Sequence, residues 1–330
     1  EPSMLTLMRL GTLAALFICS MSLSANAASM KTGSIAEQQL RHIATYFPGR
    51  MAGSPADMLT ADYLQQQFTA LGYQTNQRRF TTRYAYQHQA GDKTWRNVNA
   101  TSVIAAREGK VAQQIVIVAH SDSWTPHNDN ETQLNLGGLT NQGVDDNASG
   151  LGVMLELAQR LSTQSLHYSL RFVALSGEEI GLQGSEDYVS RMTPEEKHNT
   201  LLVINLDSLV VGSHLTFISG RQTPKAVARQ TRDRARALAR HLGISATTQT
   251  AQDEGPFDRA GFPLLMVRAS DAPGGKLSRP VALHFPLALR PQAQRDNLAY
   301  IDHWLPGRIA RRAHDSVAVL LPLIRELANP

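Results

Sequence analysis

Short apolar runs alternate with helical segments along most of this 330-residue chain. The runs have the length of buried strands, whereas the longer segments repeat apolar residues on one helical face. Strands are expected at 114–118, 169–175, 201–204 and 264–267 and loosely over 73–104, and helices at 34–47, 54–71, 149–161, 224–242 and 307–327, the last interrupted at Pro322. Strands that alternate with helices form largely parallel sheets covered on both faces. The pattern therefore predicts an α/β fold with three layers, α/β/α, around a mixed, mostly parallel central sheet.

Residues 1–27 have the pattern of a secretory signal peptide. Met4 is a plausible start, Leu10–Cys19 is largely apolar, and Ser24–Ala27 ends in the small-x-small pattern of a cleavage site. The apolar run is too short and too interrupted for a membrane span. Cleavage after Ala27 would remove the only cysteine, Cys19, and deliver a mature chain without a stable membrane anchor to the periplasm or the exterior.

The composition limits the remaining possibilities. Hydrophobic residues make up 42% of the chain, enough for one large core, and no repeat or low-complexity linker divides it, so residues 28–330 are expected to form a single domain. The formal charge of +4 is a mild excess without a basic run interleaved with aromatics, which argues against nucleic-acid binding. No Gly-x-Ser-x-Gly sequence is present, which argues against a serine hydrolase.

Polar residues follow the expected strands where each strand ends. His120 and Asp122 follow the run at 114–118, Glu178 and Glu179 follow 169–175, and Asp207 follows 201–204, while Asp145 and Asp146 precede the helix at 149–161. The carboxyl ends of the strands form the ligand crevice of an open α/β sheet, so these side chains are expected to converge.

Converging carboxylates need a positive partner. Each residue alone has an ordinary structural interpretation, because a lone histidine is usually a hydrogen-bonding partner and acidic residues often cap helices. Together, an imidazole and several carboxylates without a thiolate suit zinc. The number of carboxylates exceeds what one tetrahedral ion needs, which indicates two zinc ions with a shared ligand.

Five motifs in order resemble those of the co-catalytic zinc aminopeptidase family, which includes the secreted bacterial leucine aminopeptidases. Glutamate carboxypeptidase and glutaminyl cyclase are relatives of that family. The motifs are His120–Ser123, Gly143–Gly150, Ser176–Gly181, Asn205–Asp207 and Asp253–Pro263, and further similar segments are Phe47–Met51, Gly152–Ala158, Asn199–Asp207 and Leu305–Arg308. The resemblance covers nearly all of the mature chain and implies the zinc exopeptidase fold.

The resemblance also implies residue roles. His120 and Asp207 would bind one zinc, Glu179 would bind the other, and Asp146 would bridge both. Asp122 would accept a hydrogen bond from His120 and fix its tautomer. Glu178 would be the general base.

The family pattern is broken at the second zinc. Its histidine should lie four or five residues before an Asp that corresponds to Asp296, but Gln292 and Pro291 stand there. Three alternatives follow: an insertion that makes His284 the ligand, a weakened second site, or a misread sequence over 278–294. The first makes His284 the predicted fifth metal ligand.

The resemblance implies an exported metallo-aminopeptidase that hydrolyses N-terminal residues from peptides or proteins. Within the family, the chain is most similar to an exported aminopeptidase associated with removing N-terminal arginine from alkaline phosphatase, which makes that protein a candidate partner. An arginine preference would need acidic groups near the pocket, with Asp253, Glu254 and Asp258 as candidates, unless these are solvated loop carboxylates. The alternatives are a single-zinc enzyme like glutaminyl cyclase and a non-catalytic receptor or scaffold on the same fold.

Overall fold

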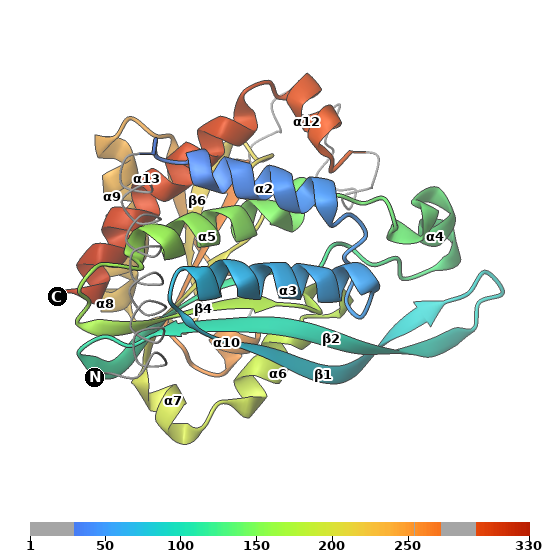
Figure 1. Ribbon diagram of the computed structural model, residues 1–330, viewed down its shortest axis with the longest axis horizontal. Coiled ribbons are helices and arrows are strands. Elements are labelled where there is room, and N and C mark those ends of the chain that lie inside the picture. Colours follow the sequence, from blue (N-terminus) through green and yellow to red (C-terminus); the bar gives the residue numbers. More distant parts are fainter. Residues whose placement is uncertain (1–29, 254, 272–294) are drawn as a thin grey trace, which may run out of the picture.

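An eight-stranded sheet in the order β1-β2-β4-β3-β5-β8-β6-β7 forms the centre of the molecule. The computed structural model describes residues 30–253, 255–271 and 295–330. The strands are β1 (Gln74–Gln87), β2 (Lys93–Arg107), β3 (Val111–His120), β4 (Tyr168–Leu175), β5 (Thr200–Leu206), β6 (His214–Ser219), β7 (Ala246–Thr250) and β8 (Leu264–Ser270). The helices are α2 (Ser34–Tyr46), α3 (Pro55–Ala70), α4 (Asp129–Leu134), α5 (Ser149–Leu161), α6 (Gln183–Arg191), α7 (Pro194–Asn199), α8 (Lys225–Ala228), α9 (Arg234–His241), α10 (Pro256–Arg259), α12 (Leu298–Trp304) and α13 (Arg308–Ala328) (Figure 1).

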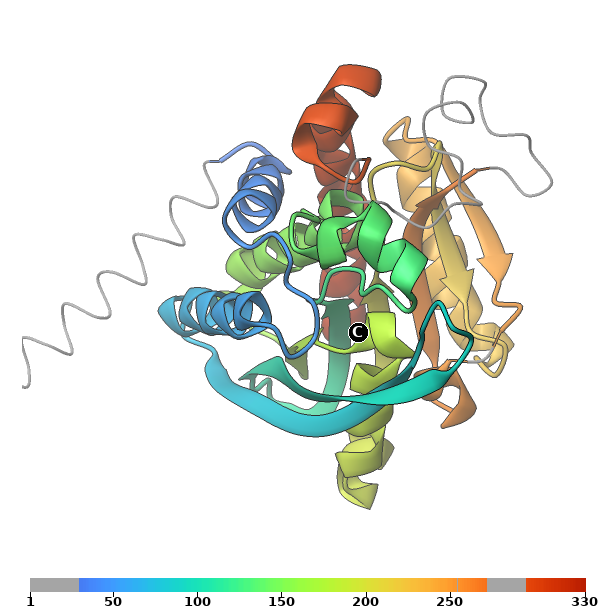
Figure 2. The ribbon, with the colours of Figure 1, turned by 90° about the vertical axis from the view of Figure 1, so that its right-hand side faces the viewer.

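The sheet is mixed, with its parallel strands in the middle. The neighbours β4, β3, β5 and β8 are parallel to one another. β1 and β2 pair antiparallel at one edge, β6 is antiparallel to β8, and β7 is parallel to β6. The prediction of a mixed, mostly parallel sheet is therefore confirmed, and the carboxyl ends of β3, β4, β5 and β8 meet at one end of the molecule, the end that faces the viewer in Figure 2.

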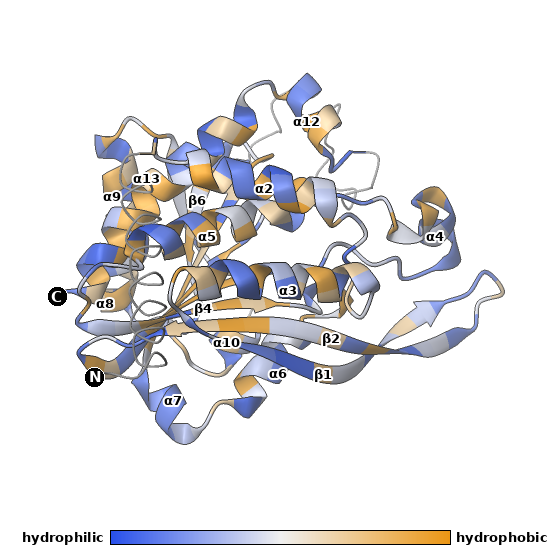
Figure 3. Ribbon diagram, in the orientation of Figure 1, coloured by the Kyte–Doolittle hydropathy of each residue, from blue (hydrophilic) through white to orange (hydrophobic). Residues whose placement is uncertain are grey.

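The two faces of the sheet are covered by different helices. On β3, Ile115 and Ile117 belong to a core cluster with α2, α3, α5 and α13, whereas Val116 and Val118 belong to a second cluster with α6 and α10. Successive residues of a strand point to opposite faces, so a continuous apolar run indicates burial on both. Figure 3 shows the contrast with the edge strand β1, which is largely hydrophilic. The three-layer architecture is thereby confirmed.

Several helix boundaries follow local signals. Ser54 caps α3 by accepting from the Asp57 amide at 3.1 Å, and Pro55 occupies the first helical position. The predicted break at Pro322 is wrong, because α13 continues through it. Pro322 removes one backbone donor, but Leu320, Leu323 and Ile324 are fully buried around it and hold the last turns against the core. No helix in the described ranges is long and apolar enough to span a membrane, and the predicted signal peptide lies outside them.

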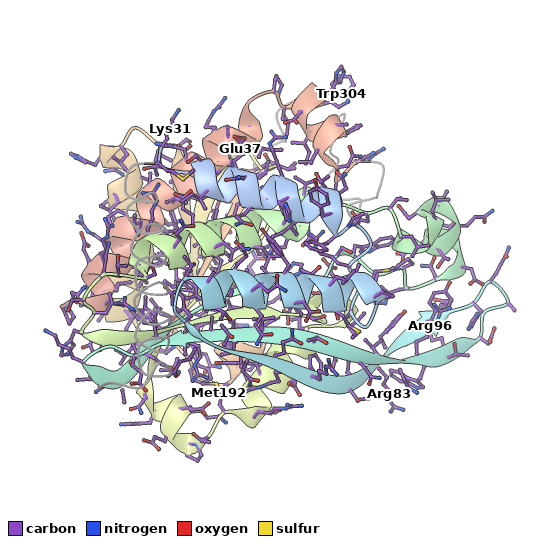
Figure 4. All side chains as sticks on the ribbon, viewed as in Figure 1. Lys31, Glu37, Arg83, Arg96, Met192 and Trp304 are labelled. Atoms are coloured by element: carbon purple, nitrogen blue, oxygen red, sulfur yellow. The ribbon has the colours of Figure 1, made fainter. Side chains whose placement is uncertain are left out.

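The β1–β2 hairpin extends beyond the helical layer. In this extension Cζ of Arg83 lies 4.4 Å from the centre of the Trp95 ring. Figure 4 labels Arg83 and Arg96 there. The far end of β1 contacts α4, since the Tyr86 hydroxyl lies 2.8 Å from an Asp129 oxygen. The hairpin thus supports the loop that leads from β3 into α4, and Nε2 of His127 in this loop lies 2.9 Å from the Glu179 carbonyl oxygen.

Candidate metal centre

Three strand ends and one turn bring the predicted side chains together. His120 is the last residue of β3, Asp207 follows β5 directly, and Glu179 lies in the short turn Glu178–Ile180 after β4. Asp146 lies in the turn Val144–Ala148 that precedes α5. Nε2 of His120 is 2.7 Å from an Asp146 oxygen and 3.5 Å from an Asp207 oxygen. One ligand atom each from His120, Asp146 and Glu179 lie within 4.8 Å of one another.

The orientation of His120 is set by its other ring nitrogen. Nδ1 lies 2.9 Å from the Asp122 carbonyl oxygen and 3.4 Å from its carboxylate. Because Nδ1–H donates there, Nε2 is the ring nitrogen that faces Asp146 and Asp207. The Asp122 carboxylate also accepts from the main-chain amides of Glu178 at 3.2 Å and Glu179 at 3.0 Å. Asp122 thus links the end of β3 to the turn after β4.

Asn147 joins the remaining ligand-bearing segments. Its side chain is fully buried and donates from Nδ2 to the Leu206 carbonyl oxygen at 3.0 Å. Its Oδ1 accepts from the amides of Gly150 and Ser208, both at 3.1 Å. These contacts hold the residues on either side of Asp207 against the start of α5. Asn147 stands inside one of the sequence motifs, but only the structure assigns it this linking position.

The charges of the cluster favour a cation. Burial and the charge of Asp146 raise the pKa of Glu179 well above its usual value. Burial acts to lower the pKa of His120, but the nearby carboxylates outweigh it and raise that pKa well above its usual value. Burial acts to raise the pKa of Asp207, yet His120 and Arg268 hold it below its usual range. A buried cluster with more carboxylates than cations is stabilised by a divalent ion, and one imidazole with carboxylates fits zinc.

Glu178 faces the same space but is held separately. Its Oε1 accepts from the amide of Ser185 at 2.6 Å and from the Ser185 hydroxyl at 2.9 Å, at the start of α6. A Cβ on Gly184 would lie 2.9 Å from the same oxygen, so a glycine there leaves room for the carboxylate. Burial raises the pKa of Glu178 to about 7, against the charge of His120. With Oε1 anchored, Oε2 is the oxygen available to a water in the cavity.

Replacement of Ser185 by alanine should lower kcat roughly tenfold, or about 1.4 kcal/mol, because it removes one of the two donors that fix Oε1 of Glu178. Zinc content should not change, since Ser185 contacts none of the four clustered ligand candidates. Steady-state kinetics with metal analysis measure both. Ser190→Ala on the same helix is the matched control, because its exposed hydroxyl only bonds the Asp187 carbonyl oxygen. An unchanged kcat in Ser185→Ala would contradict an anchoring role.

A cavity of about 510 Å³ opens onto the cluster. It is lined by His120, Asp146, Glu178, Glu179 and Asp207 and continues along the apolar side chains of Phe257 and Met266. Arg268 also lines it and pairs with Asp207 at 3.2 Å. The cavity therefore joins the candidate metal ligands to a space large enough for an amino-acid side chain.

The residues predicted to form an acidic wall of the pocket lie in different environments in the structure. Asp253 lines the cavity. Asp258 is only 1% exposed, and its carboxylate accepts from the amides of Arg221 at 3.0 Å and Gln222 at 3.1 Å. The Asp258 carboxylate thus binds main-chain amides. Among the described residues, Asp253 is therefore the remaining candidate for an acidic wall of the pocket. Glu254 and His284 lie outside the described residues.

Three further residues at this end of the sheet were not assigned a role from the sequence. Ser185 has no sequence signal, because a serine at a helix start is common. Arg50 lies in the similar segment Phe47–Met51, and Asp296 served only as the reference position for the missing histidine. Neither was assigned a role, because the residues that both contact are far away in the chain. Asp296 accepts from the amides of Asp145 at 2.8 Å and Asp146 at 3.2 Å.

Comparisons with known proteins concern the family and the fold of the chain. The sequence profile of Peptidase family M28 matches residues 102–317. The alkaline phosphatase isozyme conversion protein of Escherichia coli K12 is 49% identical over 324 residues, which cover 93% of this chain and 94% of that protein. A zinc aminopeptidase structure from Bacillus subtilis superposes with a TM-score of 0.69 at 14% identity, covering 91% of this chain and 96% of that one. Glutaminyl cyclase from Porphyromonas gingivalis gives a TM-score of 0.63 at 18% identity, covering 91% and 99%.

The two structural similarities concern the fold, whereas the profile match and the long, 49% identical alignment concern the family. The predicted family and the predicted enzyme class, a hydrolase of peptide bonds, are confirmed. The chain belongs to peptidase family M28.

Proposed function

We propose that the chain is an exported aminopeptidase that uses two zinc ions and Glu178 as general base. The observation that carries the proposal is the cavity in which Glu178 lies beside His120, Asp146, Glu179 and Asp207. A separately anchored carboxylate next to a metal-binding cluster is the arrangement needed for hydrolysis by an activated water.

In this proposal His120 and Asp207 would hold one zinc, Glu179 and His284 would hold the other, and Asp146 would be shared by both. Zinc, when bound, would polarise the scissile carbonyl and lower the pKa of a water. Glu178 accepts a proton through Oε2 from the attacking water as the water oxygen bonds to the scissile carbonyl carbon, while Ser185 fixes Oε1. It then delivers that proton to the leaving nitrogen as the carbon–nitrogen bond breaks. Asp122 keeps His120 in the tautomer that presents Nε2 to the cluster.

The substrate class follows from the cavity and the family. We infer that the chain removes N-terminal residues from peptides or proteins, with alkaline phosphatase as a candidate protein substrate because the E. coli relative is named for its conversion. Asp253 supports a preference for N-terminal arginine, since it lines the cavity that also holds the metal-binding side chains. A guanidinium beside a carboxylate there would form a charge-assisted hydrogen bond.

Purified protein should contain two zinc ions per chain and should release arginine from a panel of aminoacyl amides faster than leucine or glutamate. Metal analysis and initial rates measure the two properties. Cyclisation of an N-terminal glutamine peptide with one zinc would point to a glutaminyl cyclase instead. Absence of both zinc and turnover would favour a receptor or scaffold. Two zinc ions that become one in His284→Ala would support His284 as a ligand.

Export and domain organisation are further parts of the proposal. We infer that residues 1–27 are removed as a signal peptide and that residues 28–330 form one domain in the periplasm or outside the cell. Both ends of the described chain pack on the same helix, because α2 and α13 contact α5 and the buried Glu156 of α5 accepts from the amides of Gly33 and Ala36 at 2.9 Å. N-terminal sequencing of the exported protein and a single unfolding transition test the two inferences.

A further inference from the structure

Arg50 connects two segments of the metal centre from within the core. Its side chain is 0% exposed, although arginine is rarely buried without partners. Nε donates to the Ser121 carbonyl oxygen at 2.9 Å, between His120 and Asp122. Nη1 donates to the Gln142 carbonyl oxygen at 2.5 Å, and Nη2 to that of Gly143 at 2.8 Å. One planar guanidinium therefore fixes the end of β3 relative to the start of the turn that carries Asp146.

The approach of Arg50 to this turn is close. Gly143 has a φ of 53°, and a Cβ built on it would lie 2.9 Å from Nη2 of Arg50 and 2.7 Å from the Asp146 carbonyl oxygen. Gly49 approaches the preceding segment, since its amide donates to the Asn141 carbonyl oxygen at 2.8 Å. Glycines at 49 and 143 thus allow the main chains to come near enough for the guanidinium to bridge them.

Asp296 holds the other side of the same turn. It is 3% exposed, and its two oxygens accept from the amides of Asp145 and Asp146, as described above. The turn from Gln142 to Asp146 is therefore bound through its carbonyl oxygens by the buried side chain of Arg50 and through its amides by the buried side chain of Asp296. Burial lowers the pKa of Arg50 to about 10, with the carboxylates of Asp296, Asp122 and Asp146 acting in the opposite direction. Arg50 accordingly remains a cation at neutral pH.

We propose that Arg50 and Asp296 are positioning residues that clamp the turn 142–146 and so set the affinity of the cluster for metal. The inference rests on the proposed zinc function. It concerns two residues that do not touch substrate and whose side chains bond main-chain atoms, not the side chains of the clustered ligand candidates. Outer contacts of this kind orient metal ligands, and their loss typically weakens metal binding about 10–100-fold. The clamp supplies this orientation through the main chain from Gln142 to the amide of Asp146.

The test measures zinc affinity without turnover, by competition of the purified protein with a chromophoric chelator. Arg50→Gln and Asp296→Asn should each raise the zinc Kd about 10–100-fold. Arg107→Gln is the matched control for the first, because Arg107 donates to the carbonyl oxygens of Leu161 and Gln164 at the opposite end of the sheet. Asp258→Asn is the control for the second, because Asp258 also accepts from two successive amides. Both controls should keep the wild-type Kd.

Urea unfolding of the metal-free variants separates the clamp from general destabilisation. If Arg50→Gln is poorly folded, two other variants replace it. One is Arg50→Lys, and the other is Arg50→Ala with guanidinium ion added at a sub-denaturing concentration. The cation in Arg50→Lys should recover part of the affinity, and guanidinium should recover part of it in Arg50→Ala. Wild-type zinc Kd in folded Arg50 and Asp296 variants, or a Kd that changes equally in the controls, would overturn the clamp. A wild-type protein that binds no zinc would instead overturn the proposed function.

Discussion

Glu178→Gln is expected to keep its zinc and to lose activity, with kcat lower by roughly 10²–10⁴-fold, the range that a positioned general base supplies. Glutamine has the same shape as glutamate, and its carbonyl oxygen can still accept from Ser185 at the position of Oε1. What it lacks is the second anionic oxygen that takes the proton from water. The effect should therefore fall on kcat, with little change in KM or in metal content.

The measurement combines single-turnover kinetics with metal analysis of the same preparation. Glu186→Gln is the matched control, because Glu186 lies close by on α6 but is half exposed and pairs with Arg259 at the surface. The control should keep the wild-type kcat. Normal turnover by Glu178→Gln would remove Glu178 as the base, and loss of zinc would show that the side chain is a ligand.

Removal of metal by a chelator is expected to abolish activity and to lower the stability of the folded protein. The cluster of His120, Asp146, Glu179 and Asp207 then loses the cation that compensates its carboxylates. Zinc that binds the folded state alone stabilises it by about 2.7 kcal/mol when its concentration is 100 times the Kd. Added zinc should restore both activity and stability.

Urea unfolding with and without zinc checks the stability, and the same samples are assayed for turnover. His120→Ala should remove most of the zinc-dependent stabilisation, because Nε2 of this residue faces two of the carboxylates. His198→Ala is the control, since His198 is an exposed side chain on α7 at the other end of β5. Activity that survives exhaustive chelation, or an unfolding free energy that zinc leaves unchanged, would be incompatible with a zinc enzyme.

The fold was predictable wherever a segment carries its own signal. β3 is apolar on both faces, and α5 begins and ends at the residues that its pattern indicates. β6 and β7 were both missed, and for β7 the reason is physical. β7 reads Ala-Thr-Thr-Gln-Thr and has no large apolar side chain, so it exists through its pairing with β6 and not through a pattern of its own. α13 shows the opposite error, because burial of its last turns outweighs the missing donor of Pro322.

The sequence by itself determined which residues stand at the ends of the central strands, because the apolar runs of β3, β4 and β5 are local patterns. His120, Glu178, Glu179 and Asp207 end or follow these runs. Only the tertiary structure decided which of two neighbouring aspartates faces the cluster and which binds the main chain. Asp145 accepts from the amides of Val210 and Val211 at 2.8 and 3.0 Å, whereas the adjacent Asp146 faces His120.

The same division applies to the residues that surround the cluster. Arg50 binds carbonyl oxygens of residues that lie 71 to 93 positions away in the chain. Asp296 accepts from the amide of Asp145, which lies 151 positions away. Periodicity and spacing describe only residues close in the chain, so no local pattern could connect them. The chain carries its chemistry in short motifs, and distant buried partners, brought near by the folding of the sheet, give those motifs their geometry.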